Sequence, residues 1–170
     1  DTLPALTDAR EVFPSLTVDW VVEESFADVP VWHPAVENVI PVAVRRWRKA
    51  WVRSLRSGEI ARFRDQLRAR EYDLIIDAQG LLKSALISIQ ARGVRVGLDK
   101  HSSREPLASW FYQRRVAVQK NQHAVQRVRE LFARALDYTF DSSAIDYGIS
   151  LPASSIPGTG LSSTEPAIMF

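Results

Sequence analysis

Residues 72–85 read Tyr72-Asp73-Leu74-Ile75-Ile76-Asp77-Ala78-Gln79-Gly80-Leu81-Leu82-Lys83-Ser84-Ala85. The apolar run near its start has no polar alternation, which predicts a strand buried on both faces, as in a parallel sheet. Gly80 then lets the backbone turn tightly, and residues 82–91 have a helical pattern. This stretch therefore predicts a strand that leads through a short turn into a helix.

The turn after this strand carries polar side chains. In open α/β sheets, ligands bind at the carboxyl ends of the strands, where helix amides also point. Asp77, Gln79, Lys83 and Ser84 would therefore lie where a polar, anionic ligand can bind. The alternative is a structural turn, in which Asp77 caps the helix and Lys83 is a solvated charge. The spacing alone leaves both interpretations open.

Helical and strand patterns alternate along most of the chain. We expect helices over residues 3–12, 58–70, 82–91 and 122–136, a short helix over 26–32, and strands over 16–22, 36–44, 72–77, 94–98 and 116–118. This alternation predicts an α/β fold with a parallel sheet flanked by helices and joined by right-handed crossovers.

The two ends of the sequence suggest a domain organisation. The chain opens on a helical pattern with no strand before it and closes on an apolar run, so we expect a truncation at both ends. Ser, Pro, Gly and Asp crowd the segment before that run, which is the composition of a linker. We expect an incomplete folded domain over residues 1–138, a linker over 139–165, and the first strand of a second domain over 166–170.

The composition excludes several classes of site. A length of 170 residues suits one domain with an ordinary apolar core. The absence of cysteine excludes disulfides and thiolate metal sites. His33, His101 and His123 lie far apart and have no metal-ligand spacing, so we expect no metal and no other cofactor. We find no signal-peptide pattern and no apolar segment long enough to cross a bilayer.

The net charge of +2 hides a local concentration of cations that follows the strand expected at 36–44. Arg45, Arg46, Arg48 and Lys49 interleave here with tryptophans. Arginine presents a rigid donor fork to phosphate or carboxylate, and an indole offers a flat face to a sugar or a cation. The segment could therefore clamp a phosphorylated sugar. The alternative is an amphipathic helix whose tryptophans pack inward while its arginines are solvated.

Other charged residues have two possible readings each. Arg104 follows a strand and could bind an anion, or it could form an ion pair with Glu105 or a neighbouring acid. Glu23 and Glu24 could serve acid–base chemistry, or they could face a basic loop or cap a turn. His123 could be a catalyst or a hydrogen-bonding residue at the start of a helix.

Several blocks of sequence together resemble one known family. They are Thr2-Leu3-Pro4-Ala5-Leu6-Thr7-Asp8-Ala9, Asp19-Trp20-Val21-Val22-Glu23-Glu24, Val39-Ile40-Pro41-Val42, Arg45-Arg46-Trp47-Arg48-Lys49, Asp77-Ala78-Gln79-Gly80-Leu81 and Arg104-Glu105-Pro106-Leu107-Ala108-Ser109. Over almost its whole length, the chain is similar to the lipopolysaccharide heptosyltransferases of glycosyltransferase family 9.

This resemblance implies a fold and a reaction. Enzymes of the family have two Rossmann-like domains in the GT-B arrangement, and they transfer heptose from ADP-heptose to a 3-deoxy-manno-octulosonic acid residue of lipid A, with inversion and without a metal. The chain resembles the amino-terminal, acceptor-binding half, without its first strand and without the nucleotide-sugar domain, and would therefore be inactive alone. The family works in the cytoplasm of Gram-negative bacteria, peripheral to the inner membrane.

The resemblance also implies roles for individual residues. The basic segment looks like the loop that meets the carboxylates and phosphates of the acceptor, with one further anion contact after a later strand. The substrate-binding residues implied are Arg45, Arg46, Arg48, Lys49, Arg104, Gln79 and Lys83. The catalytic aspartate of the family belongs to a Gly-Asp pair that precedes the first block, so we assign no catalytic residue here and give Asp1 no such role.

Two other functions compete with this reading. Cations beside tryptophans also suit a nucleic-acid module, but acidic residues nearly balance the basic ones, at 20 against 22, and no nucleic-acid motif is present. We therefore expect no nucleic-acid partner. The other alternative is a non-catalytic binding module for anionic saccharides or phosphates.

Overall fold

The computed structural model describes residues 2–149, and its elements alternate as the sequence predicts. The helices are α1 (Leu3–Val12), α2 (Val44–Lys49), α3 (Trp51–Arg56), α4 (Glu59–Arg68), α5 (Leu82–Ser88) and α6 (Ala124–Leu136). The strands are β1 (Val18–Glu23), β2 (Val36–Val42), β3 (Glu71–Asp77), β4 (Arg92–Leu98) and β5 (Arg114–Val116). Three 3-10 helices complete the set: η1 (Glu24–Phe26), η2 (Pro30–Trp32) and η3 (Pro106–Phe111).

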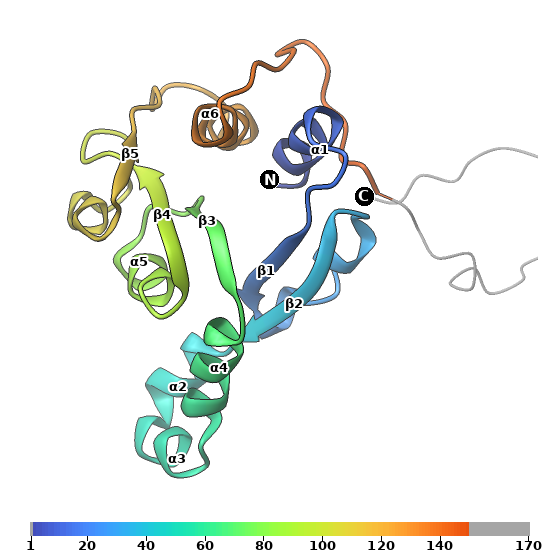
Figure 1. Ribbon diagram of the computed structural model, residues 1–170. Coiled ribbons are helices and arrows are strands. Elements are labelled where there is room, and N and C mark those ends of the chain that lie inside the picture. The colour runs from blue at the N-terminus through green and yellow to red at the C-terminus, as the bar shows by residue number, and fades with distance from the viewer. Residues whose placement is uncertain (1, 150–170) are drawn as a thin grey trace, which may run out of the picture.

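All strand pairs in the described part of the chain are parallel, which confirms the predicted fold class. β1 pairs with β2, and β3, β4 and β5 form a separate group in that order. Figure 1 shows α1 and α6 side by side over one face of the strands, with α4 and α5 on the opposite face. The helices cover both faces because each crossover between parallel strands must return along the sheet.

Polar side chains bridge the two groups of strands near the amino-terminal ends of β1 and β3. The Tyr72 hydroxyl donates to Asp19 Oδ2 at 2.8 Å, and Arg70 Nη1 lies 3.3 Å from Asp19 Oδ1. Arg70 also reaches Glu37 at 2.9 Å. Burial, together with the bond to the Asp19 carboxylate, raises the pKa of Tyr72 to about 12. These bonds fix the spacing of β1 and β3 at one end.

Two apolar clusters hold the layers together. One lies between α6 and the sheet and is formed by Val96, Leu98, Val116, Val118, Leu131 and Ala135. The other lies under α4, where Phe63 and Leu67, spaced four residues apart, pack against Ile40 and Val42 of β2. Phe63 and Leu67 are the buried residues of α4, whereas its charged side chains lie on the other sides of the helix.

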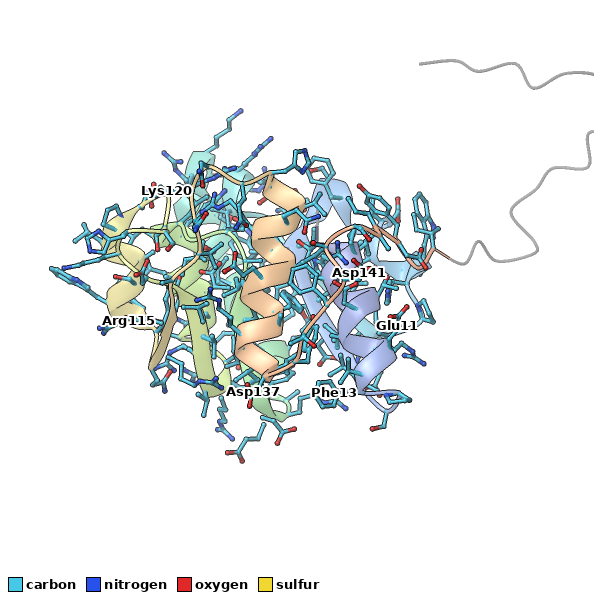
Figure 2. The ribbon with its side chains drawn as sticks, turned by 90° about the horizontal axis from the view of Figure 1, so that it is seen from above. Glu11, Phe13, Arg115, Lys120, Asp137 and Asp141 are labelled. Carbon is cyan, nitrogen blue, oxygen red and sulfur yellow. The ribbon has the colours of Figure 1, made fainter. Side chains whose placement is uncertain are left out.

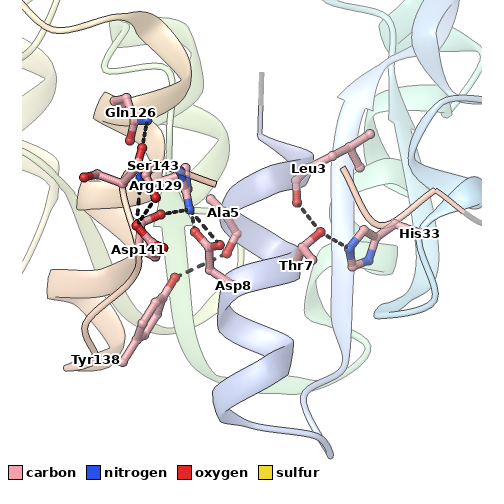
Figure 3. A network of polar contacts seen from close by, with 11 residues as sticks. Leu3, Ala5, Thr7, Asp8, His33, Gln126, Arg129, Tyr138, Asp141 and Ser143 are labelled. Carbon is pink, nitrogen blue, oxygen red and sulfur yellow. Dashed lines mark hydrogen bonds and ion pairs between the residues drawn. The ribbon is translucent and has the colours of Figure 1, made fainter. Parts of the chain in front are cut away.

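A buried ion pair joins α1 to α6, as Figure 3 shows. Arg129 is 1% exposed, and its Nε and Nη2 donate to the two oxygens of Asp8 at 2.7 and 3.0 Å. Nη2 also donates to the carbonyl of Asp141 at 2.7 Å, and the guanidinium lies 4.5 Å from the centroid of the Phe140 ring. Arg129 therefore ties both helices to the chain that follows α6.

The first part of the segment expected to be a linker, residues 139–149, contains no regular structure but contacts the domain. The Gln126 side chain donates to the Ser142 carbonyl at 3.0 Å, and Gly148 packs against Thr7 and His33. Residues 150–165 and the strand expected at 166–170 lie outside the described residues.

Several predicted elements were wrong in their bounds or type. The helix expected at 26–32 is replaced by η1 and η2, because Pro30 starts a new turn. The segment after β4, for which the sequence predicts no helix or strand, contains the 3-10 helix η3, which begins at Pro106. Two strands shifted by about two residues, to Val18–Glu23 and Arg114–Val116.

Candidate functional site

The turn after β3 is held by Asp77, which is 6% exposed. Its Oδ1 accepts hydrogen bonds from the backbone amides of Gln79 and Gly80, at 2.9 and 3.3 Å. Its Oδ2 accepts from the Tyr112 hydroxyl at 2.6 Å. Both oxygens are thus engaged, which favours the structural reading of Asp77 over ligand binding. Asp77 does not cap α5, however, because that role falls to Ser84, whose hydroxyl bonds the Leu81 backbone.

Tyr112 is a structural residue of this turn that sequence reasoning missed. Its ring is 2% exposed and fills the space above Gly97 in β4, where a side chain would collide with it. Burial and the neighbouring carboxylate of Asp77 raise the pKa of Tyr112 well above its usual range. The tyrosine therefore stays a neutral donor to Asp77 across the physiological range.

The loop after β4 locks onto this turn. The Glu105 amide donates to the Gly80 carbonyl at 3.0 Å, and the Glu105 side chain accepts from the Leu82 amide. Gly80 has φ +61°, and a Cβ there would lie 3.3 Å from Ser103 Cα, so the two backbones approach closely. Within the described residues Arg104 forms no ion pair with Glu105 or with another acid, so the ion-pair alternative for Arg104 was wrong.

Buried serines hold the rest of this loop, and they also escaped sequence reasoning. Ser103 Oγ donates to the Leu98 carbonyl at 2.9 Å, and Ser102 Oγ accepts from the Val118 amide at 2.8 Å. Asp99 Oδ1 accepts from the amides of Ser102 and His101, at 2.7 and 3.1 Å. Burial of Asp99 acts to raise its pKa, but the hydrogen bonds from Ser102 and His101 outweigh it and leave the pKa below its usual value.

As a result, Gln79, Lys83 and Arg104 are brought to one place at the carboxyl ends of β3 and β4. All three are exposed. Gln79 precedes Gly80, whose backbone lies close to the backbone of Ser103 and Arg104. Lys83 follows Leu82, whose amide donates to Glu105. This part of the candidate set is therefore presented by a rigid backbone with free cationic and amide side chains.

The basic segment after β2 is helical, not an open loop. Trp47 packs inward, with its ring edge-on to Phe63 at 5.4 Å between centroids and its Nε1 donating to Glu59 at 3.0 Å. This confirms the amphipathic-helix alternative for Trp47. The Trp51 side chain lies outside the described part of the structure.

Arg46 differs from its neighbours on α2. It contacts Glu24 through Nε and Nη2, at 3.2 and 3.1 Å, and Glu59 through Nη1 at 2.7 Å. Hydrogen bonds that Arg46 donates to Glu24 and to Glu59 raise the pKa of Arg46, and the Arg46 and Trp47 donors lower the pKa of Glu59. Glu24 therefore faces the basic segment, as one of its two readings proposed.

The other cations of α2 are exposed. Arg45, Arg48 and Lys49 point their charge to solvent, while the Arg45 amide donates to Glu23 Oε1 at 3.4 Å. Within residues 2–149 no hydrogen bond or ion pair joins this group to the turn after β3. An apolar cluster does place Trp47 of α2 and Ile87 of α5 on the same side of the sheet.

Three further observations bear on the predicted sites. His123 is the N-cap of α6 and accepts from the Val125 amide at 3.4 Å, which confirms the helix-end reading. In residues 2–149 no three acidic or histidine side chains gather as a metal would require. Across the same residues, no helix has the length and apolar character needed to cross a membrane.

The sequence matches a known protein family. Residues 60–170 match the model of glycosyltransferase family 9 (heptosyltransferase). The chain belongs to this family. It is also 57% identical over 149 residues to lipopolysaccharide heptosyltransferase 1 of Pseudomonas aeruginosa, and 55% identical over 150 residues to the Escherichia coli protein of that name. These matches cover 87% and 88% of this chain, but only 42% and 47% of the relatives.

Solved structures agree with the sequence matches. The chain is similar to E. coli heptosyltransferase WaaC with ADP-2-deoxy-2-fluoro heptose, with a TM-score of 0.83 and 54% identity over 86% of this chain and 47% of that one. The structure of the same enzyme with ADP gives a TM-score of 0.84 and 52% identity, over 91% of this chain and 50% of that one. The chain therefore has the fold of the amino-terminal part of these heptosyltransferases. It spans about half the length of the relatives that it matches.

Proposed function

We propose that the whole protein transfers heptose from ADP-heptose to a 3-deoxy-manno-octulosonic acid residue of lipid A, with inversion, in synthesis of the lipopolysaccharide inner core. In this proposal the present chain is the acceptor-binding half. The observation that carries it is the identity of 57% over 149 residues to a lipopolysaccharide heptosyltransferase, which spans every candidate residue group described above.

The reaction divides into chemical steps and acceptor binding, and these residues can supply the acceptor binding. Attack of a sugar hydroxyl on an anomeric carbon needs a base at the hydroxyl and stabilisation of the departing diphosphate. We assign neither role to this chain. Its exposed cations, Arg45, Arg48, Lys49 and Arg104, would instead bind the carboxylates and phosphates of the acceptor and hold the hydroxyl in place.

The remaining candidates have smaller roles in this proposal. Gln79 and Lys83 lie beside Arg104 and would complete the acceptor contacts at the ends of β3 and β4. Arg46 is held by Glu24 and Glu59, so it would bind the acceptor only by exchanging one of these partners. With a lipid-linked acceptor the enzyme would work at the cytoplasmic face of the inner membrane of a Gram-negative bacterium, where the second domain would bind ADP-heptose.

The test is a transfer assay on the whole protein with ADP-heptose and lipid A that bears the octulosonic acid sugars. We expect one heptose to be added, with no product when the acceptor lacks those sugars. Binding of the acceptor without any transfer would contradict the proposal and favour a non-catalytic module for anionic saccharides.

A further inference from the structure

The outer side of η3 is an apolar surface without a partner in the described chain. Trp110 is 72% exposed and Leu107 is 52% exposed. A 3-10 helix has three residues per turn, so these two side chains, three apart, lie in line on one side of η3. Ala108 and Phe111, also three apart, belong instead to the cluster that packs η3 against α5. We call Leu107 and Trp110 the η3 patch.

Arginines lie next to the helix that carries the η3 patch. Arg115 Nε donates to the Ser109 carbonyl at 2.9 Å, and Arg95 Nε donates to the Phe111 carbonyl at 2.9 Å, so both guanidinium groups are held against η3 itself. Arg104 lies two residues before the helix begins. The nearby acid, Glu105, uses its carboxylate on the Leu82 amide. The helix therefore combines an exposed apolar pair with two arginines bound to its backbone and a third, Arg104, just before it.

The position of η3 leaves the patch accessible. In Figure 1 the segment lies beside β5 and α5, at the outer edge of the three-stranded group and away from α1. Figure 2 shows Arg115 and Lys120 on this same side of the molecule, opposite Glu11 and Phe13. Arg115 and Lys120 are both exposed. A flat anionic surface could thus meet the patch and its cations at once.

We propose that the η3 patch inserts into the headgroup region of a bilayer that contains anionic phospholipid. Tryptophan suits this region because its ring is apolar and its Nε1–H is polar, and leucine adds apolar area. Arginines next to the helix attract anionic headgroups. The inference rests on the proposed function in one respect: a lipid-linked acceptor bound at Arg104 would emerge from the membrane beside η3.

The test measures binding of this chain to phosphatidylethanolamine–phosphatidylglycerol vesicles and to phosphatidylcholine vesicles by co-sedimentation. The variant Leu107→Ser/Trp110→Ser should bind the anionic vesicles about tenfold or more weakly, because it removes the inserted apolar area. Arg115→Ala should weaken binding roughly fivefold on anionic vesicles and leave phosphatidylcholine binding unchanged.

A matched control is the variant Phe26→Ser/Val31→Ser, which removes an aromatic and an aliphatic side chain that are 56% and 64% exposed in η1 and η2. It should bind as the unchanged chain does. No vesicle binding by the unchanged chain, or an equal loss in both double variants, would overturn the proposal. All four side chains are exposed, so an unchanged circular dichroism spectrum should confirm folding.

Failure of this proposal can be told apart from failure of the proposed function. In the whole protein, Leu107→Ser/Trp110→Ser should lower transfer to vesicle-embedded acceptor but leave transfer to a deacylated, water-soluble acceptor unchanged. Loss of both reactions in the double variant would contradict a membrane role for the patch. Absence of transfer in the unchanged protein would contradict the proposed function alone, because vesicle binding is measured separately.

Discussion

The turn after β3 and the basic helix α2 both carry candidate residues, but different interactions hold them. Hydrogen bonds accepted by the buried Asp77 carboxylate fix the turn, and a backbone bond joins it to the loop that carries Arg104. In contrast, α2 is joined to its surroundings by the packing of Trp47 on Phe63 and by ion pairs of Arg46 whose members are about a third to a half exposed. The turn is preorganised, whereas the α2 cations can adapt to a ligand.

This difference suggests that the two regions contribute differently to ligand binding and to stability. A rigid turn can set the position of a few donors with little loss of entropy on binding. Exposed arginines on a short helix can follow the irregular charges of a saccharide but contribute little to the stability of the domain. Substitutions in the two regions should therefore separate stability from anion binding.

The largest effect on stability should come from Asp77→Ala. The change removes the acceptor of the buried Gly80 amide and Tyr112 hydroxyl and of the partly buried Gln79 amide, which should cost about 3 kcal/mol of unfolding free energy in urea titrations. Asp77→Asn keeps an acceptor and should cost less. A loss in Asp77→Ala no greater than that of an α2 variant would remove the contrast between the regions.

Gly80→Ala should come next, with a loss of about 1–2 kcal/mol, because φ is +61° and the new Cβ would press on Ser103. Gly58→Ala is the matched control, since Gly58 has φ +72° with nothing within 4 Å of a Cβ. Gly58→Ala should lose only the free energy that a residue with a side chain requires to adopt a positive φ. Equal losses, with unchanged amide shifts at Arg104, would show that the close approach of the two loops does not constrain Arg104.

Asp99→Asn tests the pH dependence of the loop after β4. The folded-state pKa of Asp99 lies below the ordinary value of 3.8, so its ionised form contributes stability above that pH. This contribution is lost as the pH falls through the folded pKa. At neutral pH the unchanged chain should have a free energy of unfolding higher than that of Asp99→Asn by less than about 1 kcal/mol. This difference should disappear only in acid. A difference in unfolding free energy that stays constant as the pH falls below 3.8 would contradict this role of the Asp99 carboxylate.

Arg46→Ala should have the smallest effect on stability. Its ion pairs are exposed and screened, so the urea midpoint should not change at physiological salt and should fall slightly at low salt. Arg48→Ala, on the same helix, serves as the control and should show no dependence on salt. A large loss for Arg46→Ala at high salt would mean that α2 is held as firmly as the turn.

Local patterns predicted much of the fold. The apolar run of β3, the helix α1 at Leu3–Val12 and the parallel pairing were all confirmed. These features depend on residues close in sequence or on the order of the elements. The η3 helix was missed because its sequence is mixed and short, and 3-10 turns have no long periodic signal.

Long-range polar contacts could not be read from the sequence. Arg129 and Asp8 are 121 residues apart, and Tyr112 and Asp77 are 35 apart. Each of these side chains resembles an ordinary surface residue until the fold brings its partner near. The candidate cations, by contrast, came from the clustering of charge and from the family resemblance, and their roles stay predictions.

The most direct test of the acceptor role is a comparison of KM values for acceptor and donor in the whole protein with Arg45→Ala and Arg104→Ala. If both arginines hold the anionic acceptor, each change should raise the acceptor KM about tenfold or more while the KM for ADP-heptose stays within about twofold. An unchanged acceptor KM, or an equal rise for donor and acceptor, would contradict the account.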